Sequence, residues 1–315
     1  MTSSPEAEAS GRSAANSVRR ALKRAVNETS RDVGGATVLL SARGTDLADL
    51  RQHRWTGQGH SPGGRPPAGR DDVLPQGLHA TDVPPTTAPS EQPLPGTPPL
   101  DVSGQVVAVL GGTGPQGRGL AYRLALAGQQ VTIGSRTTER AEAAAAELGL
   151  GITGFDNARA ARGADIAIVT VPWEGHAATL AALRGELAGK LVIDSVNPLG
   201  FDAKGAYGIR PQEGSAAEQA AALLPDSRVT AAFHHLSAVL LTDPAIETID
   251  TDVLVLGDTR SDTDIVRALT ARIPGLRGVY AGRLRNAHQV EALVANLISV
   301  NRRYKAHAGL RITDI

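Results

Sequence analysis

From Gln105 onward, short apolar runs alternate with segments of helical periodicity, and this alternation restricts the fold more than any other feature of the sequence. The run "QVVAVLG" at 105–111 is continuous, as in a strand that is buried on both faces. "QVTIGSR", "DIAIVTVP" and "KLVIDSVNPL" follow as further strands. Strands that are separated by helices form parallel sheets with helices on both faces. The sequence therefore predicts an α/β fold with a doubly wound parallel sheet.

The remaining elements follow from the same periodicities. Further strands are expected in "GITGF", "RVTAAFHHL" and "DVLVLGD". Helices are expected at 115–127, 138–148, 157–162, 176–187, 215–224, 263–273 and 286–304. The last helix has an apolar face that we expect to pack in a small C-terminal helical part and to close a dimer, formed by Val290, Leu293, Val294, Leu297 and Ile298.

The first hundred residues differ in composition from the rest. Residues 55–100 are crowded with proline and glycine and show almost no apolar periodicity, so they cannot bury enough surface to fold. A short basic helix is expected at 14–27. The extension is either a docking or targeting arm or a plain tail. We therefore predict a disordered extension at 1–103, a nucleotide-binding domain at 104–245 and a smaller C-terminal domain at 246–315.

Composition excludes several classes of function. The 32 Lys and Arg balance the 32 Asp and Glu, so no overall field favours nucleic acid or an anionic membrane as a partner. There is no cysteine, hence no thiol nucleophile and no thiolate-held metal. Neither an apolar export signal nor a membrane-spanning run is present, and H-E-x-x-H is absent. We expect a cytoplasmic protein without a metal, whose redox chemistry would need an organic cofactor.

A glycine motif follows the first strand. Gly112, Gly114 and Gly117 satisfy G-x-G-x-x-G between a buried strand and a helix. In the Rossmann-type fold the first glycine permits the tight turn, the second lets pyrophosphate approach the backbone, and the third lets helix and strand pack closely. The phosphates then lie at the helix N-terminus. The alternative is an ordinary glycine turn.

The end of the second strand indicates which dinucleotide binds. NAD-specific folds usually carry an acidic residue there, which holds the ribose 2′-hydroxyl. This chain reads "GSRTTER", with Ser135, Arg136 and Arg140. Guanidinium groups match phosphate oxygens and remain charged, so these residues favour the 2′-phosphate of NADP(H). The alternative is a pair of merely solvated arginines.

Three stretches in this order carry a resemblance to a known family. "GGTGPQGRGLAYRLALAGQQVTIGSR", "IVTVPW" and "VTAAFHH" resemble the NADPH:coenzyme F-420 oxidoreductases, or F-420-dependent NADP reductases. The resemblance covers nearly the whole expected folded part, and the first hundred residues have no counterpart. It implies hydride transfer between NADP(H) and the deazaflavin coenzyme F-420 as co-substrate. Such a reaction needs little side-chain chemistry, because the cofactors carry the reactivity.

The resemblance also implies roles for individual residues. Ser135, Arg136 and Arg140 would bind the 2′-phosphate. The pyrophosphate would contact the glycine turn, with Gly112, Thr113, Gly114, Pro115, Gln116 and Gly117. The nicotinamide ribose and ring would lie against Val171, Pro172 and Trp173.

Five further positions are less simply assigned. His234 matches the family's histidine that faces the deazaflavin, where it would orient or polarise the ring carbonyl; the alternative is a hydrogen-bonded histidine at a strand end. Leu236 and Ser237 stand where the family often has Ile and Pro. Asn197 either donates to nicotinamide or deazaflavin or only turns the chain before its proline. His176 follows an extra Gly175, which leaves its role open.

Two other functions compete with this interpretation. One is an NADP-dependent reductase that acts with FMN or FAD or on a small imine, motivated by the departures near His234. The other is a redox-sensing module that binds NADPH without oxidising it.

Overall fold

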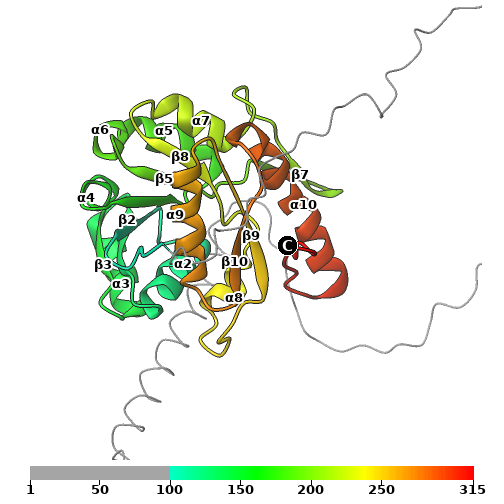
Figure 1. The fold of residues 1–315 in the computed structure, drawn as a ribbon, viewed down its shortest axis with the longest axis horizontal. Coiled ribbons are helices and arrows are strands. Elements are labelled where there is room, and N and C mark those ends of the chain that lie inside the picture. The colour runs from blue at the N-terminus through cyan, green and yellow to red at the C-terminus, as the bar shows by residue number, and fades with distance from the viewer. Residues whose placement is uncertain (1–99) are drawn as a thin grey trace, which may run out of the picture. The chain divides into compact units, whose positions relative to one another are not determined.

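In residues 100–315, eight strands form one central sheet and two more form a separate hairpin; Figure 1 shows their arrangement. The sheet strands are β1 (Val106–Leu110), β2 (Gln130–Ser135), β3 (Thr153–Asp156), β4 (Ile166–Val169), β5 (Leu191–Asp194), β8 (Arg228–Ala231), β9 (Thr251–Gly257) and β10 (Leu276–Tyr280). The hairpin consists of β6 (Leu199–Asp202) and β7 (Gly205–Gly208). The computed structural model describes residues 100–315, which fall in one compact unit. The helix expected at 14–27 and the disorder expected before residue 100 lie outside the described residues.

The strand order is that of a doubly wound sheet. It runs β10-β9-β8-β5-β4-β1-β2-β3, and the six strands from β3 to β8 are all parallel. β9 is antiparallel to β8, and β10 is parallel to β9. The chain reverses its winding direction between β1 and β4, at the point where ligands bind in such sheets. The predicted fold class is confirmed.

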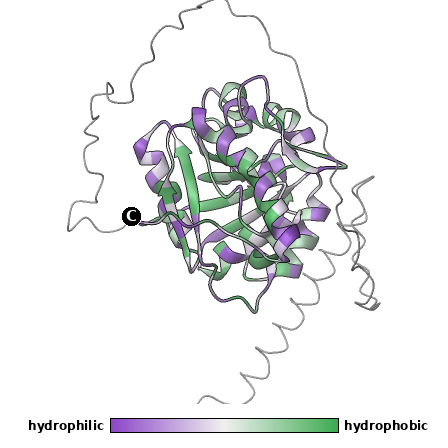
Figure 2. Ribbon diagram, turned by 90° about the vertical axis from the view of Figure 1, so that its right-hand side faces the viewer, coloured by the Kyte–Doolittle hydropathy of each residue, from purple (hydrophilic) through white to green (hydrophobic). Residues whose placement is uncertain are grey.

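Helices cover both faces of this sheet. They are α2 (Pro115–Leu126), α3 (Thr138–Leu148), α4 (Asn157–Arg162), α5 (Trp173–Ala182), α6 (Arg184–Leu187), α7 (Ala216–Leu223), α8 (Ala238–Thr242), α9 (Arg260–Ala271) and α10 (Ala287–Tyr304), with a 3₁₀ turn η1 (Leu284–Asn286). In β1, Val107 and Val109 join the core under α2, α3 and α9, while Ala108 and Leu110 join the core under α4 to α7. Both faces are therefore buried, which explains the continuous apolar run. Figure 2 shows hydrophobic strands inside a more hydrophilic helical layer.

Most expected elements are present, and two have the expected bounds, α3 and α4. The strand expected over "RVTAAFHHL" is wrong in its second half. β8 ends at Ala231 because β9 pairs only with Thr230 and Ala231. Phe233 then turns the chain with a φ of 69°, in the left-handed region, and its carbonyl accepts a hydrogen bond from Gln116. His234 and His235 therefore lie in a turn.

Periodicity did not predict the β6–β7 hairpin, β10 or α8, all of which are five residues long or shorter. Residues 246–315 thus contribute two strands to the main sheet as well as α9 and α10. The division at about residue 245 remains a prediction, and it falls between β8 and β9 of one sheet.

The expected apolar face of α10 is divided between two environments. Val290 and Leu297 are buried, and Val290 belongs to a small core with α7, β8 and β9. Leu293, Val294 and Ile298 are half-buried. α10 also packs against β7 (Figure 1). A Cβ on Gly208 of β7 would lie 2.8 Å from the Ala292 Cβ of α10. A dimer through this helix remains a prediction.

Candidate functional site

The turn after β1 is built from close backbone contacts. Gly111 has a φ of 71°, and a Cβ on it would lie 2.7 Å from Val171 Cγ1. A Cβ on Gly112 would lie 2.6 Å from the Val109 carbonyl oxygen. The Gly112 amide donates to the Gly134 carbonyl at 3.0 Å, which ties the turn to β2. Only glycine fits at these two positions without displacing a strand end.

The start of α2 combines tight packing with an open backbone. A Cβ on Gly117 would lie 2.6 Å from Gly112 Cα, so helix and turn touch directly. A Cβ on Gly114 would meet nothing nearer than 3.9 Å. Gly114 is the N-cap of α2, no side chain caps the helix, and Pro115 occupies its first turn. The amides of this turn are therefore available to an anion, with the helix dipole in its favour.

Two of the expected pyrophosphate residues also hold the turn itself. Gln116 donates from Nε2 to the Phe233 carbonyl at 2.9 Å, which joins the glycine turn to the segment after β8. The Thr113 carbonyl accepts from Arg118 Nε at 3.0 Å. The backbone of this turn thus has fixed partners on α2 and after β8.

The residues expected to bind the 2′-phosphate of the ribose differ in exposure. Ser135 ends β2 and is buried, whereas Arg136 and Arg140 are exposed. Among the described residues, neither arginine has an ion pair or a hydrogen bond within the protein. Both guanidinium groups remain available for a phosphate.

The residues expected at the nicotinamide follow β4. Val171 is buried under the glycine turn, Pro172 is exposed, and half-buried Trp173 begins α5. Thr170 Oγ1 donates to the Leu110 carbonyl at 2.9 Å, which joins the ends of β4 and β1. These side chains thus reach the same sheet edge as the glycine turn.

A buried hydrogen-bonded pair joins the first turn of α5 to the end of β5. His176 Nε2 lies 2.6 Å from Asp194 Oδ2, and both side chains are fully buried. His176 Nδ1 lies 2.9 Å from Gln219 Oε1 on α7. Burial is the largest single influence and would lower the pKa of His176, but the Asp194 carboxylate, the hydrogen bond with Gln219 and the Glu291 charge together raise it above its usual value. The sequence alone did not predict Asp194, Gln219 or Glu291 as site residues. Of these, Asp194 could have been found, because it is an acidic residue at the end of the apolar run "LVID".

Glu291 lies on α10. Its carboxylate is buried and accepts from the amides of Ala216 at 3.0 Å and Ala217 at 3.2 Å, so it caps the N-terminus of α7. Burial raises the pKa of Glu291 to about 7, and the nearby Asp194 charge adds to this. α10 is therefore linked to the histidine pair through α7.

Two histidines and an asparagine meet at the ends of β5 and β8. Asn197 Nδ2 donates to the His234 carbonyl at 2.9 Å, so Asn197 does more than turn the chain. Asn197 Oδ1 and both ring nitrogens of His234 and His235 are buried and have no hydrogen-bond partner in the protein. Burial lowers the pKa of each histidine to about 4, so both rings are neutral at pH 7. Leu236 is buried next to them. This group of unpartnered polar atoms fits a ligand that carries its own donors and acceptors.

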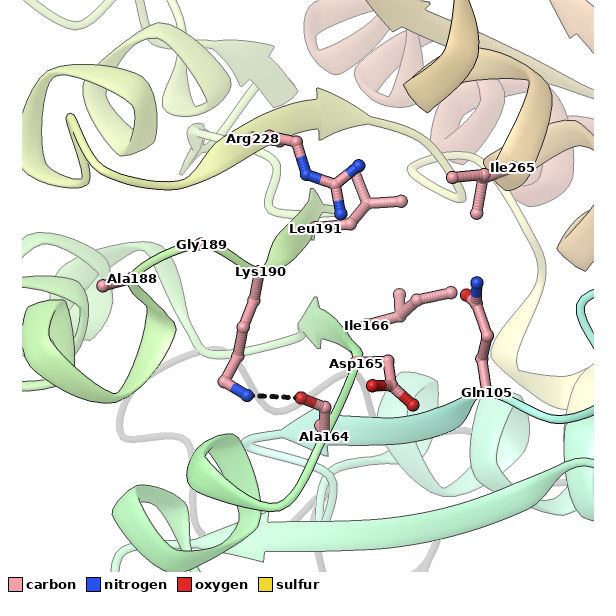
Figure 3. A pocket seen from close by; sticks show the side chains of 10 residues that line it. All are labelled: Gln105, Ala164, Asp165, Ile166, Ala188, Gly189, Lys190, Leu191, Arg228 and Ile265. Atoms are coloured by element: carbon pink, nitrogen blue, oxygen red, sulfur yellow. Dashed lines mark hydrogen bonds between the residues drawn. The ribbon is translucent and has the colours of Figure 1, made fainter.

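A hollow of about 470 Å³ opens at the opposite edge of the sheet (Figure 3). Its walls come from the amino ends of β4, β5 and β8. Lys190 Nζ donates to the Ala164 carbonyl at 2.5 Å, and Arg228 is paired with Asp262 at 2.5 Å. Ligands of doubly wound sheets lie at the carboxyl ends of the strands, so this hollow is not the expected nucleotide site.

Two kinds of feature are absent from residues 100–315. No three His, Cys, Asp or Glu side chains gather there in a way that could hold a metal ion. No helix of that part is long and apolar enough to cross a bilayer.

The fold and the glycine turn define a dinucleotide-binding protein of the doubly wound class. Residues 106–198 match the family model described as NADP oxidoreductase coenzyme F-420-dependent. The chain is 40% identical over 222 residues to the F-420-dependent NADP reductase of Methanothermobacter marburgensis, which covers 66% of this chain and 98% of that protein. It is 35% identical over 221 residues to the reductase of the same name from Methanocaldococcus jannaschii, with the same two coverages. The chain therefore belongs to the F-420-dependent NADP reductase family, as the resemblance predicted.

A solved structure agrees with this assignment. A crystal structure from Arthrobacter sp. FB24, titled as a candidate F-420-dependent NADP reductase, superposes with a TM-score of 0.59 at 26% identity. The match covers 67% of this chain and all of that one.

The neutral histidines predict an acid-sensitive stability. Their pKa is about 4 in the folded state against about 6.5 when unfolded, so the unfolded state binds more protons between these values. The stability they contribute is complete above pH 6.5 and is lost as the pH falls toward 4. We expect the free energy of unfolding to fall by up to about 3 kcal/mol less in His235→Gln than in wild type between pH 7.5 and pH 4, measured by urea unfolding. His307→Gln, at an exposed position, is the control; curves for His235→Gln that run parallel to wild type would refute the assignment.

Proposed function

We propose that this chain transfers a hydride between NADP(H) and coenzyme F-420, as an 8-hydroxy-5-deazaflavin:NADP oxidoreductase. The observation that carries the proposal is the identity of 35–40% over nearly the whole length of proteins named F-420-dependent NADP reductase. The site geometry supports it independently. An uncapped helix start, two unpaired arginines and a group of unpartnered polar atoms all belong to one edge of the sheet.

The described residues fit the dinucleotide. The open backbone at Gly114 would admit the pyrophosphate, and the first turn of α2 would bind its charge. Ser135, Arg136 and Arg140 would hold the 2′-phosphate. Val171, Pro172 and Trp173 would line the nicotinamide end.

The described residues also fit a second heterocycle. Its ring would lie by Asn197, His234 and Leu236. A deazaflavin carbonyl or ring N–H would give the unpartnered Asn197 and His234 atoms their missing partners. No protein nucleophile is needed.

Bound NADP(H) and F-420 supply the hydride donor and the hydride acceptor. The chain binds the adenosine end tightly, orients the two rings and keeps water away from them. His234, which is neutral at pH 7, would donate to or accept from the deazaflavin without carrying a charge into the site. We therefore expect His234 to modulate the rate without being essential.

One experiment separates this function from its rivals. Purified full-length protein is mixed with NADPH and F-420, and the deazaflavin's visible absorption is followed. Loss of that absorption with stoichiometric NADPH oxidation supports the proposal. Turnover only with FMN, FAD or an imine would instead indicate another reductase. Tight NADPH binding without oxidation would indicate a sensing module.

Cofactor preference tests the two arginines. Arg136→Asp places a carboxylate where a 2′-phosphate is expected and restores the residue type that NAD-specific folds carry. We expect the Kd for NADPH to rise at least about tenfold while that for NADH stays within about threefold, measured by quenching of intrinsic fluorescence. Arg184→Asp, at an exposed arginine elsewhere on the surface, is the matched control. An equal loss for both nucleotides would contradict the assignment.

The glycine turn is tested by a substitution that the folded protein tolerates. A methyl group at Gly114 meets nothing within 3.9 Å, so Gly114→Ala should leave the free energy of unfolding within about 0.5 kcal/mol of wild type. It would, however, occupy the space that the pyrophosphate approaches. We expect NADPH affinity to fall more than about tenfold. Gly104→Ala, which meets nothing within 4 Å, is the control, and unchanged affinity in Gly114→Ala would place the pyrophosphate elsewhere.

Assembly and location complete the proposal. The half-buried Leu293, Val294 and Ile298 of α10, with exposed Val300 and Tyr304, support a homodimer through this helix. We also propose that the protein is cytoplasmic. The balanced charge supports small-molecule cofactors rather than nucleic acid as partners.

A further inference from the structure

The His176–Asp194 pair has no part in hydride transfer as described above. Both side chains are fully buried, and the two atoms that meet are 2.6 Å apart. Taking charged groups out of water costs several kcal/mol per ion, and their attraction repays this only with good geometry and further hydrogen bonds. Here Gln219 Oε1 satisfies the second ring nitrogen of His176, and the Val196 amide donates to Asp194 Oδ1 at 3.0 Å. The pair is completely satisfied within the protein, which excludes it as a ligand site.

Its position suggests what it does. His176 lies in the first turn of α5, three residues after Trp173. Asp194 is the last residue of β5, directly before the loop that carries Asn197. The pair therefore crosslinks the two segments that follow β4 and β5.

Each segment also contacts a residue that the proposed function places against a cofactor ring. The Trp173 ring lies over the His176 ring, with centroids 5.6 Å apart and an interplanar angle of 31°. On the other side, Asn197 Nδ2 donates to the His234 carbonyl. A change at the pair would thus shift Trp173 relative to Asn197 and His234.

We propose that His176 is a positioning residue for hydride transfer: held by Asp194 and Gln219, it fixes the wall formed by Val171–Trp173 relative to the wall formed by Asn197 and His234. The inference rests on the proposed function, which places the nicotinamide at the first wall and the deazaflavin at the second. The adenosine end is bound by β1, α2 and the end of β2, which the pair does not join. His176 should therefore affect the rate of transfer much more than nucleotide affinity.

Protonation of the pair gives a second signature. The groups that face His176 are Asp194 on β5, Gln219 on α7, Glu291 on α10 and the Trp173 ring on its own helix. The pKa of His176 is raised, so the ring is fully protonated below the usual histidine range and its ionic hydrogen bond with Asp194 is then complete. That bond weakens as the pH rises through the raised pKa. The pKa of Glu291 is about 7, so Glu291→Gln is needed to separate its titration from that of His176.

The kinetic test uses full-length wild type, His176→Gln, Asp194→Asn, the double variant and His307→Gln as control. We expect His176→Gln to lower kcat about tenfold while the Kd for NADPH changes less than about twofold, since a small misplacement of reacting rings is costly. The double variant should be little worse than either single variant. Wild-type kcat should fall as the pH rises through the raised pKa of His176. This fall should remain in Glu291→Gln and disappear in His176→Gln. Equal losses of kcat, NADPH affinity and stability, or no loss at all, would overturn the proposal.

A fluorescence test needs neither turnover nor F-420. Trp173 is observed in a Trp55→Phe background, since the chain has two tryptophans. A protonated imidazole quenches a neighbouring indole, so emission should rise as the pH passes the raised pKa of His176, and the rise should vanish in His176→Gln. Its absence in the parent would show that His176 does not hold a charge against Trp173 and would overturn the proposal. A Trp55→Phe parent that shows this rise but no turnover with NADPH and F-420 would refute the proposed function and not the pairing.

Discussion

The close approach of the glycine turn to its neighbours is the constraint on which the rest of the structure depends. Gly112 has no room for a side chain beside Val109, and Gly117 has none beside Gly112. Because α2 touches the end of β1 directly, its uncapped N-terminus points at the carboxyl edge of the sheet. Val171 closes the turn from β4, and Gln116 ties it to the segment after β8. Every proposed ligand contact is positioned relative to this turn.

A second tie runs from the other end of α2. Arg123 is buried and donates to the carbonyls of Leu241 at 2.9 Å and Asp243 at 2.8 Å, with further bonds to Leu240 and Ile246. Four carbonyls replace the hydration of its guanidinium, without a carboxylate. α2 is thus fastened to the chain both before and after the His234 turn, which fixes the position of the helix relative to that turn.

Local signals predicted most of the fold, and long-range contacts explain what was not predicted. The bounds of α3 and α4 and the parallel direction of the first strands follow from the alternation of strand and helix periodicity. The strand expected over His234 stops early because β9 pairs with only two residues of β8, which the sequence of β8 alone does not reveal. The same limit applies to the site. Ser135, Arg136 and Arg140 stand next to a recognisable strand end, whereas His176 meets Asp194 only once β4 and β5 are adjacent.

We propose that the protein binds the adenosine half of the dinucleotide with one set of elements and aligns its reactive half with another. A structure determined with NADP⁺ bound tests this division most directly. The account predicts the 2′-phosphate among Ser135, Arg136 and Arg140, and the nicotinamide beside Trp173 with one face open toward Asn197 and His234. A dinucleotide bound in the hollow lined by Lys190 and Arg228, or a nicotinamide turned away from His234, would contradict it.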